Sequence, residues 1–171
     1  MAALSFAAMK PKLLLLILPA AIFLACKPAG EALPTCPPGT RAVGEPPPEG
    51  QEVSCAKVAD GKVVVDADGK PVKEGPFVLF RPDGSKMMQG SYRDGKQDGE
   101  WTLWYENGVK QSLDHYRNGL QNGDHSGWYP DGKIAAMGKY RDGKREGAWK
   151  RWDPQGFRNW EEIYRDDKKI Q

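Results

Sequence analysis

Residues 99–122 read GEWTLWYENGVKQSLDHYRNGLQN, and this 24-residue unit occurs four times between Gly75 and the C-terminus without insertion or deletion. A Tyr-Arg pair holds one position in every copy, and so does a column of large aromatic residues: Phe80, Trp104, Trp128 and Trp152. Glycine fills two further columns, Gly75, Gly99, Gly123 and Gly147, and Gly84, Gly108, Gly132 and Gly156. A fixed period of this length is typical of stacked repeat architectures.

Each copy reads as a β-hairpin. Residues 100–105 and 109–116 are rich in Trp, Tyr, Val and Thr, which favour pleated strands. Residues 106–108 and 117–119 end in Asn-Gly, which accepts the positive φ angles of tight hairpin turns. Because a single hairpin is marginally stable in water, the copies should stack on one another. The sequence therefore predicts an all-β fold, an elongated antiparallel meander of four hairpin repeats over residues 75–171.

The spacing within the first strand of a copy leaves one question open. Trp101 and Trp104 are three residues apart, which places them on opposite faces of a regular strand. Either a bulge lies between them, or the sheet carries aromatic side chains on both faces. The tryptophans are expected to serve cohesion first and ligand binding second.

The N-terminal segment predicts export. Residues 1–25 read as a signal peptide of the lipoprotein type, with Lys10 and Lys12 before an apolar run that is too short to span a membrane. Met9 is an alternative start to Met1. The end of this segment resembles a bacterial lipobox, which implies lipidation of Cys26, although Phe23 and Leu24 stand where lipoboxes prefer Leu and a small residue. A plain secretory signal is the alternative.

Residues 26–50 are rich in Pro, Gly and Glu and predict an extended tether, followed by a cap strand region at 51–74. With Cys26 lipidated, Cys36 and Cys55 remain for one disulfide, which suits an exported protein. A metal site would need four Cys or His ligands, and no histidine lies nearby in the sequence. Residues 66–69, Asp-Ala-Asp-Gly, are expected to form a turn rather than a calcium loop.

Charge and chemistry narrow the function. The chain has 25 Lys and Arg against 23 Asp and Glu, and removal of the leader takes away Lys10 and Lys12, which leaves the two balanced. Nucleic-acid binding is therefore not expected. His115 and His125 are the only two histidines, and both are interpreted as strand residues that face solvent. We expect no enzyme, no catalytic residue, no metal site and no cofactor.

The glycines, the aromatic column and the recurring Tyr-Arg-Asp-Gly-Lys resemble MORN repeats, in the longer variant found in bacterial proteins labelled YwqK-family antitoxins. The resemblance covers residues 75–171 and implies a hairpin array with a binding role. The segment around Cys36 and Cys55 also resembles the leader of some bacterial lipoproteins that carry such repeats.

The third copy departs from the others. It places His125 where they have Phe77, Trp101 and Trp149, and Gly127 where they have Leu79, Leu103 and Arg151. A notch flanked by Trp128 and Tyr129 could seat a ligand there, but a loosely packed repeat is the favoured explanation of the strand glycine. The candidate binding surface consists of His125, Trp128, Tyr129, Trp104 and Trp152.

The favoured hypothesis is a noncatalytic, monomeric, lipid-anchored envelope protein whose repeat sheet binds another protein or a cell-wall polymer. Lys27 after Cys26 favours the outer membrane, because the aspartate that retains some lipoproteins in the inner membrane is absent. The main alternative is an antitoxin or immunity protein that neutralises a specific toxin. A third hypothesis is the binding of lipid headgroups.

Overall fold

The structure is a computed structural model that describes residues 33–44 and 52–171, with the backbone alone at residue 159. The expected signal peptide, Cys26 and most of the expected tether lie outside the described residues. Among the residues described, no helix is long and apolar enough to cross a membrane.

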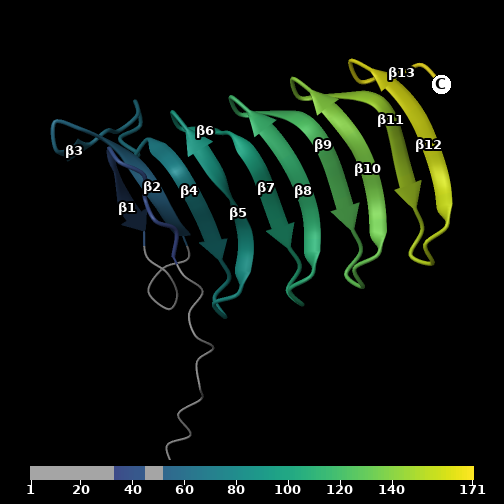
Figure 1. Ribbon diagram of the computed structural model, residues 1–171, viewed down its shortest axis with the longest axis horizontal. Helices are drawn as coiled ribbons and strands as arrows, with labels where there is room; N and C mark the ends of the chain where they lie inside the picture. Colours follow the sequence, from purple (N-terminus) through teal and green to yellow (C-terminus); the bar gives the residue numbers. More distant parts are fainter. Residues whose placement is uncertain (1–32, 45–51) are drawn as a thin grey trace, which may run out of the picture. The chain divides into compact units, whose positions relative to one another are not determined.

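The described residues form one open antiparallel sheet of thirteen strands (Figure 1). Neighbours in the sheet follow the order β1-β2-β4-β5-β7-β8-β9-β10-β11-β12-β13, with β3 paired to β2 and β6 to β5. The expected all-β meander is therefore confirmed. The strands are β1 (Thr40–Gly44), β2 (Glu52–Ala59), β3 (Lys62–Val63), β4 (Lys73–Phe80), β5 (Lys86–Arg93), β6 (Lys96–Gln97), β7 (Gly99–Trp104), β8 (Lys110–Arg117), β9 (Leu120–Trp128), β10 (Ile134–Arg141), β11 (Lys144–Trp152), β12 (Arg158–Arg165) and β13 (Lys168–Lys169).

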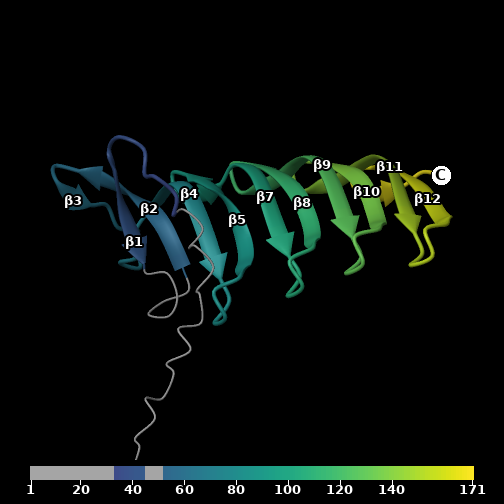
Figure 2. The same ribbon diagram turned by 60° about the horizontal axis from the view of Figure 1, so that its bottom comes forward.

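The hairpins β4–β5, β7–β8, β9–β10 and β11–β12 are the four copies, and their turns lie along one edge of the sheet (Figure 2). In the second copy the amide of Tyr105 donates to the carbonyl of Val109 at 2.8 Å, and that of Gly108 donates to Tyr105 at 3.0 Å. Gly108 takes a φ of 80°, which a residue with a side chain adopts at a penalty.

Two-residue turns connect one copy to the next at the other edge. Asn118 and Gly119 have φ angles of 51° and 82°, the pattern of a type I′ turn. In the last copy Asp167 replaces the glycine and still takes a φ of 64°. The carboxylate of Asp167 accepts the backbone amide of Arg145 at 2.9 Å, and this hydrogen bond offsets part of the strain.

The question of the two tryptophans is resolved by a bulge in the partner strand. Leu103 pairs with Ser112, but Trp104 pairs with Lys110, so Gln111 is the extra residue. The bulge lies in β8 and leaves β7 regular, so Trp101 and Trp104 point to opposite faces. We call these the Trp101 face and the Trp104 face. Corresponding register shifts occur in the other copies.

The Trp101 face holds the copies together. Trp101 is 1% exposed and lies between Phe77, Tyr92 and Tyr116, with ring centroids 5.4, 5.1 and 6.1 Å away. Its indole lies against Gly90, where a Cβ atom would come within 2.2 Å of the ring. The fourth copy repeats this arrangement, with Trp149 against Gly138 at 2.3 Å. Glycine at this position therefore makes room for an indole on the neighbouring strand.

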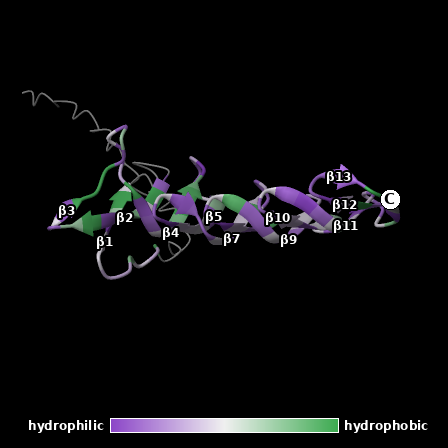
Figure 3. Ribbon diagram, turned by 90° about the horizontal axis from the view of Figure 1, so that it is seen from above, coloured by the Kyte–Doolittle hydropathy of each residue, from purple (hydrophilic) through white to green (hydrophobic). Residues whose placement is uncertain are grey.

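The N-terminal end supplies an apolar cap to the sheet. The predicted disulfide between Cys36 and Cys55 is present, and it brings part of the expected tether to the sheet, where residues 40–44 pair as β1 with β2. Val53, Val78 and Phe80 form a buried cluster on the Trp104 face. Hydrophobic residues are prominent around β2, while the strands near β11 are more hydrophilic (Figure 3).

The turn expected at residues 66–69 is present. The carboxylate of Asp66 accepts the backbone amides of Asp68 and Lys70, both at 2.9 Å. Before this turn, β3 ends at Val63, and Val65 forms an isolated bridge with Pro71.

Candidate functional site

A row of alternating aromatic and basic side chains crosses the Trp104 face. The register pairs each member of the aromatic column with the first strand residue after the turn, and in three of the four pairs that residue is basic. We call this set the aromatic-basic row: Phe80, Lys86, Trp104, Lys110, Trp128, Ile134, Trp152 and Arg158. Because one copy spans two strands, successive aromatic positions lie about 9.6 Å apart.

The three tryptophans of this row are accessible, whereas Phe80 is buried. Phe80 packs with Val53 and Val78 and is 7% exposed. In later copies Thr102, Ser126 and Lys150 replace Val78, so no aliphatic cluster of that kind covers the tryptophans. All three tryptophans are only half-buried. The face therefore changes from an apolar cap at its N-terminal end to a surface that a ligand can reach.

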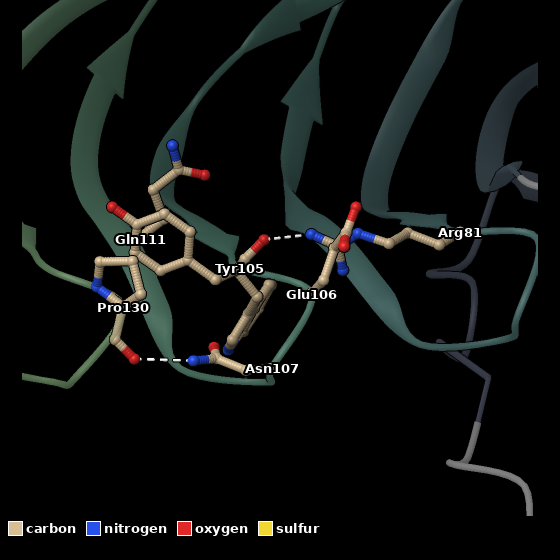
Figure 4. A pocket seen from close by; sticks show the side chains of 7 residues that line it. Arg81, Tyr105, Glu106, Asn107, Gln111 and Pro130 are labelled. Atoms are coloured by element: carbon tan, nitrogen blue, oxygen red, sulfur yellow. Dashed lines mark hydrogen bonds between the residues drawn. The ribbon is translucent and has the colours of Figure 1, made fainter.

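Two hollows adjoin Trp104. One, of about 450 Å³, extends toward the turns and is lined by Arg81, Tyr105, Gln111 and Pro130, among others (Figure 4). The other, of about 370 Å³, extends over the sheet and is lined by Trp104, Gln89, Glu100, Thr102 and Lys110, among others. Both combine an aromatic wall with hydrogen-bonding side chains. Small polar ligands with an apolar face suit such a lining.

Side chains in the turns keep the row in register. The hydroxyl of Tyr105 donates to the carbonyl of Trp128 at 2.9 Å, and that of Tyr129 donates to Trp152 at 2.7 Å. In the first copy the guanidinium of Arg81 donates to the carbonyl of Trp104. Each turn is thus tied to the aromatic position of the next copy, and these hydrogen bonds fix the spacing of the tryptophans.

The Trp101 face carries a polar pair between the second and third copies. Asp114 and His125 pair across β8 and β9, with the Nδ1 atom of His125 2.7 Å from Oδ1 of Asp114. Gln121 donates to the same oxygen at 3.0 Å. The ring of His125 stacks on Trp149 with centroids 5.4 Å apart. Burial raises the pKa of Asp114, but hydrogen bonds and the attraction of His125 outweigh it and leave the pKa below its ordinary value.

This pair replaces the glycine and tryptophan of the neighbouring copies. Asp114 occupies the position of Gly90 and Gly138, and His125 that of Trp101 and Trp149. The sequence singled out His125 but not its acid. The signal was present, because Asp114 is off-consensus in the strand that pairs with His125, but it required the hairpin register to be known.

The structure divides the predicted binding residues between two faces. Trp104, Trp128 and Trp152 lie together on the Trp104 face, while His125 lies on the opposite face and does not meet Trp128. Tyr129 lies at the turn edge, where its hydroxyl donates a hydrogen bond to the backbone carbonyl of Trp152.

At the position of the notch expected in the third copy, Gly127 is buried between Ser112 and Ala136, and a Cβ atom there would lie 3.7 Å from the ring of His125. His115, the other histidine, lies on the Trp104 face and contacts the carbonyl of Asp124 at 3.0 Å. Within the described part of the chain, no three His, Cys, Asp or Glu residues converge as metal ligands would.

Residues 97–118 match the family model described as a MORN repeat variant. This range covers most of the second copy, so the resemblance to MORN repeats is confirmed there. No curated protein matches the chain.

Proposed function

We propose that this MORN-repeat protein is a noncatalytic scaffold, anchored in the cell envelope through a lipid on Cys26, whose sheet binds a protein or a cell-wall polymer. The aromatic-basic row is the observation that carries this proposal. It offers one half-buried tryptophan in each of three successive copies, at a spacing set by the strands. Repetition of one contact at a fixed interval suits an extended partner that engages several copies together.

The division of labour between the faces supports a binding role for the row. Trp101 and Trp149 are buried against glycines and tyrosines on the Trp101 face, where they supply cohesion. Trp104, Trp128 and Trp152 bury less of their surface, so they contribute less to folding. Their exposed area remains available for a partner, and an indole contributes strongly to an interface when it becomes covered.

The test of the scaffold is retention from an envelope extract. The full chain in detergent should retain one partner saturably, and replacement of Trp104, Trp128 and Trp152 together by alanine should abolish that retention. His115→Ala is the matched control, because this side chain lies on the same face outside the row. Equal retention by the triple variant and the wild type would refute a role for the row.

The anchor has its own test. The disulfide of the cap is consistent with export to an oxidising compartment. Incorporation of labelled palmitate should be lost in Cys26→Ser and kept in Cys36→Ser, and outer-membrane fractions should contain the wild type. Label that persists in Cys26→Ser would rule out this anchor.

The alternative proposal is an antitoxin or immunity role, and the Asp114–His125 pair is the observation that favours it. This pair gives the junction of the second and third copies a polar identity that the junctions at Gly90–Trp101 and Gly138–Trp149 lack. A one-to-one partner would need such a landmark, whereas a repetitive polymer would not. Capture of a single protein in equimolar amount would favour this role over the scaffold, provided that the captured protein is toxic. The wild-type chain should suppress that toxicity, and the His125→Ala variant should not.

A further inference from the structure

The aromatic-basic row has a period that the sheet itself sets. Its tryptophans recur once in every two strands, and strands lie about 4.8 Å apart, so the period is about 9.6 Å. The successive hairpins keep a similar orientation along the sheet (Figure 1). The row therefore presents indoles along a nearly constant direction, as a linear polymer would require.

The charges of the row are positive. Lys86, Lys110 and Arg158 pair with Phe80, Trp104 and Trp152, respectively, and Ile134 takes this place in the third copy. Arg158 lies 2.8 Å from Glu161 and is partly neutralised. Within the described residues Lys110 makes no ion pair, and it lines the second hollow beside Trp104. Trp104 and Lys110 thus form the strongest site for an anionic ligand in the row.

The polar lining of that hollow suits hydroxyl groups. Gln89 and Thr102 can donate or accept, and Glu100 accepts hydrogen bonds, all in reach of a ligand over Trp104. A carboxylate of the ligand would approach Lys110, since Glu100 repels it. The apolar face of a ring would lie on the indole. An aromatic platform surrounded by such groups matches a sugar ring that carries an acidic substituent.

We propose that the aromatic-basic row binds a linear β-1,4-linked glycan that carries one carboxylate per disaccharide. This inference rests on the proposed scaffold function and names its polymer. Successive sugars of an extended β-1,4-linked chain are turned over, so every second ring presents the same face, and the length of a disaccharide is close to the two-strand period. Each tryptophan would stack on every second sugar, and Lys110 and Arg158, the bases beside Trp104 and Trp152, would pair with carboxylates.

Single-stranded nucleic acid is the competing polymer, because it also combines flat rings with negative charge. It carries a charge on every unit, whereas the row supplies at most one base per copy. Acidic side chains lie at the turns beside the row, as at Asp83, Glu106 and Asp131. These carboxylates would repel a closely charged phosphate backbone. The glycan, with its wider charge spacing, fits the row better.

The test titrates the full chain, in detergent, with defined oligosaccharides while tryptophan fluorescence is followed. The carboxylated probe is a hexasaccharide of alternating N-acetylglucosamine and N-acetylmuramic acid, and the neutral probe is the N-acetylglucosamine hexamer. We expect the carboxylated probe to bind roughly tenfold more tightly than the neutral one. Lys110→Gln should remove that preference, and Lys110→Arg should retain it. Trp104→Ala should weaken both probes, and His115→Ala neither.

Several outcomes would overturn the inference. These are equal binding of the two probes, a preference unchanged in Lys110→Gln, or tighter binding of an α-1,4-linked polygalacturonate or of oligothymidylate. Lys110 is exposed, so the result does not depend on a variant that fails to fold. If the chain binds no glycan but its retention of a partner from extract still requires the tryptophans, the glycan proposal is refuted and the scaffold proposal stands. Retention that persists in the triple tryptophan variant would refute the row's role in the scaffold as well.

Discussion

The Asp114–His125 pair can be exchanged for the glycine and tryptophan of its neighbours. Trp101 of the second copy lies on Gly90 of the first, and Trp149 of the fourth copy lies on Gly138 of the third. The double variant Asp114→Gly, His125→Trp would recreate this arrangement between the second and third copies. A buried tryptophan removes about 150–250 Å² from water. If the exchange buries about 100 Å² more apolar surface than His125 does, the gain is about 2.5 kcal/mol at 25 cal/mol per Å².

The single variants should behave in the opposite way. In His125→Trp the indole meets the side chain of Asp114, where the equivalent glycines leave only 2.2 and 2.3 Å for a Cβ atom. The buried carboxylate also loses its hydrogen bond to His125, and this loss costs about 1–3 kcal/mol. Asp114→Gly leaves His125 without its acid. We therefore expect each single variant to be less stable than the wild type, and the double variant to be more stable.

The assay is urea unfolding of the four proteins as a double-mutant cycle at several pH values. The pKa of Asp114 is depressed in the folded state. Its contribution is therefore complete above the ordinary aspartate pKa, about 3.9, and is lost as the pH falls through that value toward the folded pKa. The double variant should lack this acid-dependent part. Additive single effects, or identical pH profiles for the wild type and the double variant, would refute the reasoning.

Two further predictions concern packing and the cap. Gly90→Ala should destabilise the chain by about 1–3 kcal/mol, because its Cβ would overlap the buried ring of Trp101. Gly127→Ala is the control, because the atom nearest to its Cβ would lie 3.7 Å away. In the same urea assay this variant should be as stable as the wild type or slightly more stable. Cys36→Ser should lower the free energy of unfolding by about 3 kcal/mol through loss of the disulfide to Cys55. A reductant should lower the stability of the wild type but not that of the variant. An equal effect of the reductant on both proteins would contradict this prediction.

The sequence was sufficient for the architecture because the determinants of the architecture repeat. The 24-residue period, the turn glycines and the alternation of strands all predicted the same meander, and each copy confirmed the others. The facing of Trp104 was not predictable, because a spacing of three residues is compatible with a bulge in either strand. The bulge lies at Gln111, which no Gly or Pro marks in the sequence.

The candidate site was predicted in its members but not in its grouping. Trp104, Trp128 and Trp152 were recognised as a column, yet His125 was assigned to the same surface. The face of the sheet on which a side chain lies depends on whether its position along the strand is odd or even. The residue that it pairs with depends on the register between neighbouring strands. Asp114 lies eleven residues before His125 and becomes its neighbour only once β8 and β9 are paired. Long-range pairing of this kind leaves no mark in local composition.

The Asp114–His125 pair and Lys110 are therefore physically independent features of the repeats. The Asp114–His125 pair lies among the cohesive rings of the Trp101 face, where a change of one partner alters folding stability. Lys110 lies on the other face, is exposed, and contacts no acid within the described residues, so its change should alter binding without altering stability. A variant of each type, measured for both unfolding and ligand affinity, separates the two roles. If Lys110→Gln changed the free energy of unfolding as much as it changed the free energy of ligand binding, the assignment of cohesion to one face and recognition to the other would fail.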